Sequence, residues 1–462
     1  MLIKKTAVYA VGNFGSKILA YVMVLVYSYY ITAEDMGYYD IILTTISMVQ
    51  PLVLFQINDG VYRYLIDAKK QMQSTIVGTG FRFLCLTTLA AEVLLIGLNF
   101  FVELQYPVWI GALLASTMFF VYLQDVIRGL GKSKLYAAMG ILNSVVMLGC
   151  EVVGLLLLKL GVQALVISKV IANLTCILVM LICEKEAASG LRIKLQWQQL
   201  SPLLKYSAPL VPNTISWWIV NSSSRYIILG FLGTSFNGIF SMASKFPTIL
   251  TTITSIFFLA WQESAIKEYN SPNRDSFFSD VFRKYYTLLF TLCICAIPAT
   301  RIVIELFVAQ EYKISWQYTG FLYLGAALSA LCSFLGMGYQ ISKETGRSFA
   351  TTVFAAALNI GVNILLVQVI GLYAASFAAF ASYLFLFAIR IKHTKRYFTL
   401  SVNWLRFALL FVGVLAMMAF VYMAGSVWSS MILSLVAVAI LAWQNKELVL
   451  PLLLKMKNLG GR

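Results

Sequence analysis

The chain has 462 residues, of which 60% are hydrophobic and only 12% are charged. Soluble domains carry about 25% charged residues. So few charges cannot cover a globular body of this size, which excludes a soluble enzyme. The 35 Lys and Arg residues outnumber the 19 Asp and Glu residues, for a net charge of +16. In a chain this apolar, the excess is typical of the cytoplasmic loops of a membrane protein rather than of nucleic-acid binding.

Fourteen apolar segments follow one another along the chain, and a membrane-spanning helix needs about 20 apolar residues. Long alternating patterns typical of barrel strands are absent, so the predicted fold class is an all-α polytopic membrane protein. Twelve spans remain the alternative if the last two segments do not span. In chain order, the predicted spans cover residues 8–31, 38–58, 76–99, 107–127, 136–158, 161–183, 206–230, 236–262, 284–308, 315–342, 349–369, 371–391, 404–424 and 428–444.

The loops predict the orientation of these spans. One set of alternate loops, with the start and the tail, carries 27 Lys and Arg residues, whereas the opposite set carries only Lys159 and Lys313. Because cytoplasmic loops collect basic residues, both termini are expected in the cytoplasm. The first segment, 8–31, is long enough to span and is followed by further spans, so no cleavable signal peptide is expected.

Weak internal matches predict two repeated lobes, which in transporters place the substrate between them. Three matches occur in order, at offsets of 201, 204 and 210 residues: Ile31–Tyr39 with Leu232–Phe240, Asp59–Arg63 with Glu263–Lys267, and Leu160–Ala164 with Ile370–Ala374. The predicted domains are an N-terminal six-helix lobe over 1–190, an amphipathic cytoplasmic linker over 191–205, a C-terminal six-helix lobe over 206–395, and two extra helices with a basic cytoplasmic tail over 396–462.

Six basic residues fall inside the predicted spans, where a charge at mid-bilayer costs about 2.5–3.5 kcal/mol on insertion scales. Three of them have structural interpretations. Arg82 lies near the inner end of its span and is expected to snorkel to the surface. Arg301 is expected to pair with Glu305, one turn further on. For Lys169, snorkelling and pairing with a neighbour both remain open.

The other three, together with one loop residue, are predicted to bind an anionic substrate. Lys17 lies too far along the first span to snorkel readily, and Arg225 ends the polar run Asn221-Ser-Ser-Ser-Arg225, which cannot face lipid without a large desolvation cost. Lys245 lies in the following span, and Arg63 lies at the cytoplasmic end of the second span. Such side chains supply both the charge and the hydrogen-bond donors that phosphate requires.

Acidic residues give two further predictions. Asp59 with Arg63, and Glu263 with Lys267, are acid-then-base pairs four residues apart at matching places in the two repeats. They are either helix-end salt bridges or parts of an inner gate. Inside the spans, the candidates for carrying a coupling proton or cation are Glu92, Asp125 and Glu151. Asp125 could instead simply pair with Arg128.

Residues for metal or hydrolytic chemistry are scarce. The seven cysteines form no CxxC motif, so free, reduced thiols are expected. The only histidine, His393, is placed in a basic loop and cannot build a zinc site or a Ser-His-Asp triad. We therefore expect no cofactor, no metal and no enzymatic activity. Pro51, Pro209, Pro212 and Pro247 predict kinks of the kind that alternating access uses.

One resemblance is carried by the opening Asn13-Phe-Gly-Ser-Lys17, the turn Ile31–Asp40, Pro51 followed by Asn58-Asp-Gly-Val-Tyr-Arg63, and the stretch from Pro209 to Pro247. With the 6+6+2 layout along the whole length, these motifs are similar to those of the bacterial polysaccharide repeat-unit flippases. Those proteins, which handle lipid-linked oligosaccharides, belong to the multidrug/oligosaccharidyl-lipid/polysaccharide exporter superfamily. The motifs are loose, so they indicate the superfamily better than the substrate.

The resemblance implies a cargo and a location. The cargo would be an undecaprenyl-diphosphate-linked oligosaccharide, moved from the inner to the outer leaflet of the bacterial plasma membrane for capsule, O-antigen or exopolysaccharide assembly. The diphosphate would lie in a cationic cavity, to which Lys17, Arg63, Arg225 and Lys245 could contribute. Membrane lipid, polysaccharide polymerase and glycosyltransferases are the implied partners, and nucleic acid is not one.

Three other functions compete with this interpretation. An ion-coupled drug exporter of the same superfamily would need an acidic cavity for cationic drugs, whereas the central spans here are richer in cations. A polysaccharide polymerase or membrane glycosyltransferase would need a sizeable aqueous loop or a catalytic constellation, and the outer loops are short. A lipid II flippase differs only in its cargo, so the sequence does not separate it.

Overall fold

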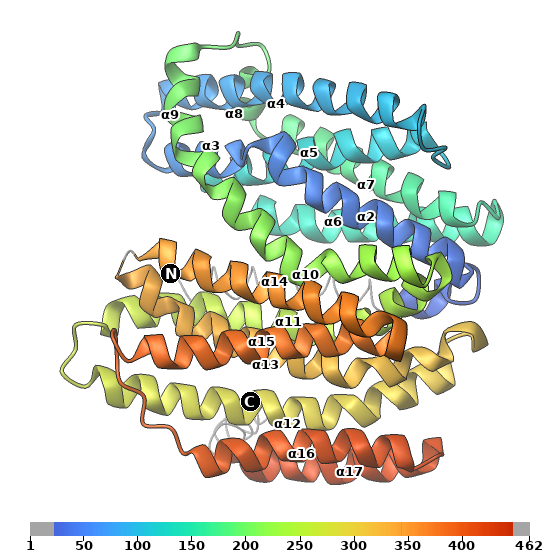
Figure 1. Cartoon of the computed structure of the whole chain (residues 1–462). Coiled ribbons are helices and arrows are strands. Elements are labelled where there is room, and N and C mark those ends of the chain that lie inside the picture. Colours follow the sequence, from blue (N-terminus) through green and yellow to red (C-terminus); the bar gives the residue numbers. More distant parts are fainter. Residues whose placement is uncertain (1–22, 343, 447–462) are drawn as a thin grey trace, which may run out of the picture. The chain divides into compact units, whose positions relative to one another are not determined.

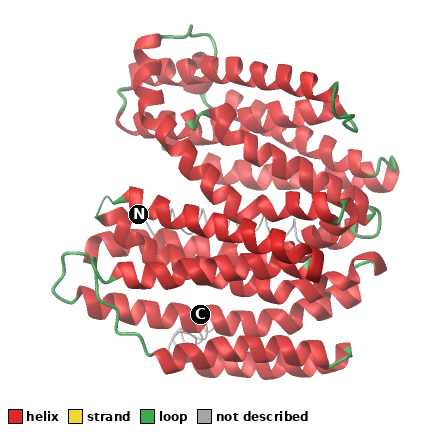
Figure 2. Cartoon of the chain, in the orientation of Figure 1, coloured by secondary structure: helices red, strands yellow, loops and turns green. Residues whose placement is uncertain are grey.

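The structure is a computed structural model that describes residues 23–342 and 344–446. The ordered elements within these ranges are all helices, joined by loops (Figure 2). The helices of the first half are α2 (Ala33–Leu54), α3 (Ile57–Asp67), α4 (Lys70–Asn99), α5 (Pro107–Gly129), α6 (Ser133–Val152), α7 (Val162–Cys183), α8 (Lys185–Gly190), α9 (Trp197–Ser207) and α10 (Val211–Phe231). Those of the second half are α11 (Thr234–Glu268), α12 (Arg274–Phe307), α13 (Thr319–Ile341), α14 (Thr345–Ile370), α15 (Tyr373–Thr394), α16 (Trp404–Met423) and α17 (Val427–Gln444).

Eleven helices of the described chain are long and apolar enough to cross a membrane, or twelve if the bent pair α2 and α3 is one span. The predicted all-helical membrane protein is therefore confirmed. Two predicted spans have no counterpart in this set. Most of 8–31 lies outside the described residues, and 206–230 corresponds to α10, whose polar run lowers its hydropathy. The count of fourteen spans stays a prediction.

The chain divides into two compact units, and the division falls inside α10, between Ile219 and Val220. In the first unit, α5 packs against α3 and α7, and α6 packs along α7. In the second unit, α13 packs against α11 and α15, α14 lies along α15, and α12 contacts both α16 and α17, as the ribbon shows (Figure 1). Each unit is thus a helical bundle in its own right.

Residues 191–205, predicted as an amphipathic linker, form a turn and most of helix α9 in the first unit. Leu200 and Leu203 are buried, and α9 packs against α3 and α4. Gly60 of α3 makes this approach close, since a Cβ at that position would lie 3.0 Å from the carbonyl oxygen of Leu203. The amphipathic pattern therefore reflects packing against the bundle on one face.

The second predicted span is broken rather than straight. Phe55 and Gln56 separate α2 from α3, with left-handed φ values of 48° and 52°, and the two helices meet at a bend of 53°. Non-glycine residues rarely adopt that conformation, so the surroundings must hold it. Gln56 donates a hydrogen bond from Nε2 to Thr214 Oγ1 at 2.7 Å, which fixes the break against the start of α10.

Candidate functional site

The predicted site residues fall on both units of the chain. Lys17 lies outside the described residues, so its predicted role is untested. Arg63 and the acids Asp59 and Asp125 lie on α3 and α5 in the first unit, while Arg225 and Lys245 lie on α10 and α11 in the second.

Arg63 makes a different ion pair from the one that the sequence predicts. Its Nη1 lies 2.5 Å from Asp67 Oδ2, four residues toward the end of α3, and the two side chains are 49% and 68% exposed. Asp59 precedes Arg63 by four residues, whereas Asp67 follows it. Asp59 lies within electrostatic range of Asp125 and Arg128. Of the two interpretations of Asp59 and Arg63, the helix-end salt bridge is not the one formed, because Asp67, one turn later, pairs with the guanidinium; the gate interpretation stays a prediction.

Asn58, Asp59, Asp125 and Arg128 form a polar group between α3 and α5, which we call the α3–α5 cluster. Asn58 is buried and donates from Nδ2 to Asp125 Oδ2 at 2.8 Å. The guanidinium of Arg128 lies 4.5 Å from the centre of the Tyr62 ring. The cluster thus brings two half-buried carboxyls and one cation to the same end of two helices.

The corresponding pair of the second repeat forms as predicted. Lys267 Nζ lies 2.6 Å from Glu263 Oε1 on α11, and the side chains are 70% and 42% exposed. An exposed pair of this kind contributes little to stability, because water screens the attraction. It can therefore open and close at small cost.

The polar run on α10 faces protein within the second unit. Ser223 and Ser224 are buried and donate to Asn359 Oδ1 of α14, each at 3.4 Å. Tyr383 of α15 donates its hydroxyl to Asn221 Oδ1 at 2.6 Å. The hydroxyl and amide groups of this run thus hold α10 against two neighbouring helices.

Arg225 is the charged end of that run, and it reaches α11. Its Nη1 donates to the carbonyl oxygen of Asn221 at 3.4 Å, and its Nη2 donates to Ser244 Oγ at 3.3 Å. Ser244 directly precedes Lys245, which is half-buried on α11. The contact with Ser244 places Arg225 beside the part of α11 that carries Lys245, and guanidinium and ammonium groups are both suited to binding phosphate.

Two acids proposed for coupling lie deeper in the first unit. Glu151 is 1% exposed on α6, immediately before a π-helical turn at Val153–Leu157, and lies within electrostatic range of Tyr27 and Tyr39. Such turns are frequent at functional sites. Glu92 of α4 lies against Gly111 of α5. A Cβ at Gly111 would lie 2.5 Å from Oε2 of Glu92. These two carboxyls occupy separate places rather than one shared site.

Two of the remaining basic residues have structural contacts. Arg82 is exposed, and its guanidinium donates to the carbonyl oxygens of Ile193 at 3.2 Å and Leu191 at 2.9 Å, which ties the segment before α9 to α4. Arg301 pairs with Glu305 at 3.4 Å, as predicted. Arg82 thus joins two segments of the first unit, whereas the Arg301–Glu305 pair lies within α12.

Sequence reasoning missed a fully buried arginine. Arg390 was counted with the basic loops, but it is 1% exposed on α15 and donates to the carbonyl oxygen of Cys332 at 2.8 Å and to Thr352 Oγ1 at 3.1 Å. Its place in the apolar segment 371–391 was the available signal. A guanidinium with donors pointing several ways can tie α13, α14 and α15 together at this point.

A second missed group lies near the ends of α13 and α15. His393 belongs to the last turn of α15 rather than to a loop, and its Nδ1 lies 3.0 Å from the hydroxyl oxygen of Tyr339. Tyr397 donates its hydroxyl to Glu344 Oε2 at 2.9 Å. Burial, followed by this hydrogen bond and the nearby carboxylate, raises the pKa of Tyr397 to about 12, so it stays a neutral donor.

A third missed feature is a pair of buried amides on α14. Asn359 donates from Nδ2 to Ser382 Oγ at 3.3 Å, and Asn363, one turn later, is fully buried. The amide atoms of Asn363 have no hydrogen-bond partner in the described part of the chain. Their spacing of four residues in the apolar segment 349–369 was the signal that could have found them.

Metal and thiol chemistry finds little support among the residues that the structure describes. They contain no group of three His, Cys, Asp or Glu residues that could hold a metal ion. All seven cysteines fall within the described ranges and are free thiols, as predicted.

The eleven or twelve candidate spans found within residues 23–446, arranged as two helical bundles, define a multi-pass membrane protein. The sequence profile of a family described as polysaccharide biosynthesis protein matches residues 2–262, which is more than half of the chain. The chain therefore belongs to that family.

Solved structures share its fold. The structure titled lipid II flippase MurJ, in an inward closed conformation, is similar with a TM-score of 0.72 and 13% identity over 96% of this chain and 99% of that one. An inward-facing multidrug resistance MATE family transporter of the MOP superfamily has a TM-score of 0.68 and 11% identity over 84% and 98%. An outward-facing MATE family transporter of the same superfamily has a TM-score of 0.62 and 12% identity over 88% of this chain and 95% of that one.

No curated protein matches the sequence. At these identities the solved structures show a common fold.

Proposed function

We propose that the chain is a flippase that moves an undecaprenyl-diphosphate-linked oligosaccharide repeat unit from the inner to the outer leaflet by alternating access. The product would feed capsule, O-antigen or exopolysaccharide assembly. The proposal includes fourteen spans in the bacterial plasma membrane, with both termini cytoplasmic. It also includes glycosyltransferases and a polysaccharide polymerase as proteins that act before and after it.

The observation that carries this proposal is the family match over residues 2–262. The chemistry of α10 and α11 supports it. Arg225 donates hydrogen bonds to the carbonyl oxygen of Asn221 at 3.4 Å and to Ser244 Oγ at 3.3 Å, and Lys245 directly follows that serine. Arginine and lysine side chains inside transmembrane segments have a high desolvation cost. Binding of the anionic diphosphate of a lipid-linked substrate would offset this cost.

In this proposal, each predicted residue has a role. Lys17, Arg63, Arg225 and Lys245 bind the diphosphate. Asp59, Glu263 and Lys267 belong to an inner gate, where the exposed Glu263–Lys267 pair can break readily. The acids that could carry a coupling proton or cation are Glu92, Asp125 and Glu151.

The test is a flipping assay in proteoliposomes loaded with a fluorescent undecaprenyl-diphosphate-linked oligosaccharide. A hydrogen bond to a charged group contributes about 1.5–3 kcal/mol, so Arg225→Ala should slow translocation by roughly tenfold to a hundredfold. Arg225→Lys keeps the charge and should retain part of the rate. Arg396→Ala removes an exposed cation after α15 and serves as the control. If Arg225→Ala flips the cargo as fast as Arg396→Ala, the proposed binding role is wrong.

The two structural neighbours supply the alternative functions. A lipid II flippase and a multidrug transporter both share the fold, so the same proteoliposomes are loaded with lipid II in one arm and with a cationic dye under an ion gradient in another. Translocation of lipid II without the oligosaccharide would favour the first alternative. Dye efflux without movement of either lipid would favour the second.

A further inference from the structure

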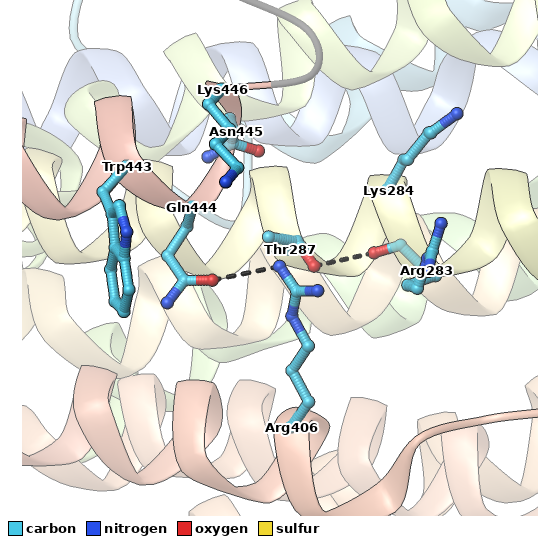
Figure 3. Close-up of a pocket in the computed structure, with 8 residues that line it drawn as sticks. All are labelled: Arg283, Lys284, Thr287, Arg406, Trp443, Gln444, Asn445 and Lys446. Carbon is cyan, nitrogen blue, oxygen red and sulfur yellow. Dashed lines mark hydrogen bonds between the residues drawn. The ribbon is translucent and has the colours of Figure 1, made fainter.

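A basic pocket of about 200 Å³ lies between α12, α16 and α17 in the second unit (Figure 3). It lies outside the residues proposed to handle cargo. α12 contributes residues from its first turns, α16 from its start, and α17 from its end. The lining side chains are those of Arg283, Lys284, Thr287, Arg406, Trp443, Gln444, Asn445 and Lys446.

The charge of this pocket is positive. Arg283, Lys284, Arg406 and Lys446 contribute four cations, and no carboxylate is among the lining residues. Among the described residues, Asp280 is the acid that pairs with these cations, at 2.6 Å from Arg283 Nη2 and 2.7 Å from Lys284 Nζ. One carboxylate shared by two cations leaves most of the positive charge uncompensated, so the pocket favours an anion.

The pocket is also held in shape by its own hydrogen bonds. Arg406 donates from Nη2 to Gln444 Oε1 at 3.0 Å, which joins the start of α16 to the end of α17 (Figure 3). Asn445 is buried and donates from Nδ2 to Thr291 Oγ1 of α12 at 2.9 Å. These bonds join the start of α16 to the end of α17, and the residue that follows α17 to α12.

Two tryptophans indicate the depth of the pocket in the membrane. Trp443 lines it and is 68% exposed, and Trp404, at the first position of α16, is 52% exposed. Exposed tryptophans at the ends of spans typically lie at the level of the lipid headgroups. Beyond them, α16 and α17 leave large apolar side chains exposed, among them Leu405, Leu409 and Leu435. The pocket therefore opens where a headgroup meets acyl chains.

We propose that this pocket binds the phosphate of an anionic phospholipid in the leaflet at this end of the bundle. Basic pockets between transmembrane helices on the cytoplasmic side are suited to acidic headgroups. The guanidinium groups of Arg283 and Arg406 can each donate to phosphate oxygens, the ammonium groups of Lys284 and Lys446 add charge, and Trp443 borders the glycerol region. The bound lipid fastens α16 and α17 to α12.

The experiment is native mass spectrometry of the purified full chain in detergent. The protein is titrated with dioleoyl phosphatidylglycerol or dioleoyl phosphatidylcholine, which have the same acyl chains and differ in net charge. Wild-type protein should prefer phosphatidylglycerol by about tenfold or more, given the attraction of several basic side chains to one acidic lipid. Arg283→Gln with Arg406→Gln should abolish the preference.

Two further variants keep the result interpretable. Lys395→Gln with Arg396→Gln removes the same charge from exposed positions after α15 and should leave the preference intact. Because Arg406 also joins α16 to α17, Lys284→Gln with Lys446→Gln is tested in parallel, and it should weaken the preference without breaking a helix contact. Equal lipid preference in wild type and both pocket variants would overturn the proposal.

Two competitors distinguish the source of the phosphate. Inorganic phosphate at the same concentration should not displace phosphatidylglycerol, since it lacks the acyl chains that hold the lipid at this depth. If it does, the pocket is a site for soluble anions and the proposal is wrong. If undecaprenyl diphosphate displaces the phospholipid, and the pocket variants lose that binding too, the site serves cargo instead. Neither result depends on whether the protein flips the oligosaccharide.

Discussion

The bent pair α2 and α3 of the first unit and helix α11 of the second contain segments that the sequence predicts to be repeats of one another. The pair runs from Ala33 to Asp67, and α11 covers the 35 residues from Thr234 to Glu268. Both contain a proline, yet only the pair is broken, with a bend of 53°. The matching sequences therefore take two different shapes.

The comparison shows that proline alone does not break this element. Pro247 lies inside α11, which continues through it. In the first unit the break comes at Phe55 and Gln56, whose left-handed backbone costs about 1–2 kcal/mol per residue. The hydrogen bond from Gln56 to Thr214, at 2.7 Å, and the contact of Phe55 with Phe83, at 5.8 Å between ring centres, help to offset that cost.

After the break, equivalent positions have different surroundings. Counting from the match of Asp59 with Glu263, Gly60 corresponds to Ser264. α3 packs closely against α5 and α9, and a Cβ at Gly60 would lie 3.0 Å from a backbone oxygen of α9. Ser264, in contrast, is half-buried and donates a hydrogen bond of 2.9 Å to the carbonyl oxygen of Ala260 in its own helix. The segment after the bend, α3, is therefore packed between other helices of the first unit.

The largest expected effect is from a bulky residue at Gly60. In Gly60→Leu, even the Cβ would lie 3.0 Å from a backbone oxygen of α9, and overpacking typically costs 1–3 kcal/mol. We expect the melting temperature in detergent, followed by tryptophan fluorescence, to fall by about 5 °C or more.

The matched change is Ser264→Leu on α11, where the side chain has room. It should lower the melting temperature by less than half as much. Equal losses at the two positions would mean that the bend does not create the close packing, and the contrast between the repeats would fail.

The second-largest effect on stability is expected at Asn58, the amide residue that follows the break between α2 and α3. Asn58→Ala removes the 2.8 Å hydrogen bond to Asp125 and leaves a half-buried carboxyl with one donor fewer. Such a loss costs about 1–3 kcal/mol. Its counterpart is Gln262→Ala, which removes an exposed hydrogen bond of 3.2 Å to Gln340 and should cost only a few tenths of a kcal/mol.

Urea or thermal unfolding of both variants measures the difference, and a double-mutant cycle of Asn58→Ala with Asp125→Ala isolates the pair. The cycle should show clear coupling. Additive losses would show that Asn58 acts through packing rather than through the carboxyl.

Much of the fold was predictable from the sequence, because hydrophobic length and loop charge act locally. The predicted segment 107–127 became α5 at Pro107–Gly129, and 161–183 became α7 at Val162–Cys183. The break at Phe55 and Gln56 was not predictable, since left-handed residues are set by tertiary contacts. The polar run ending at Arg225 was expected to line water or protein, because burying its hydroxyl groups in lipid would be too costly, and two of its serines contact α14.

Side-chain partners were harder to predict than helices. Asp67 displaced Asp59 as the partner of Arg63, and Arg390 was placed in a loop although it is buried. Both errors arise because spacing along one helix gives the candidates for a contact but not the choice among them, which depends on neighbouring helices. The same limit applies to the basic pocket of the second unit, whose cations come from α12, from α16 and from the segment just after α17.

The smallest expected effects are those of the two exposed ion pairs at the ends of the repeated element. Both Arg63–Asp67 and Glu263–Lys267 are short, but every one of their side chains is more than two-fifths exposed. Water and salt screen such pairs, and an acid placed before the base is the better order on a helix. Double-mutant cycles should therefore shift the melting temperature by no more than about 1 °C for either pair, with Glu263–Lys267 the larger, and both shifts should vanish in 0.5 M salt. A large, salt-resistant coupling at Arg63 would mean that Asp67 holds it firmly, and a guanidinium held in that way could not be released to a phosphate.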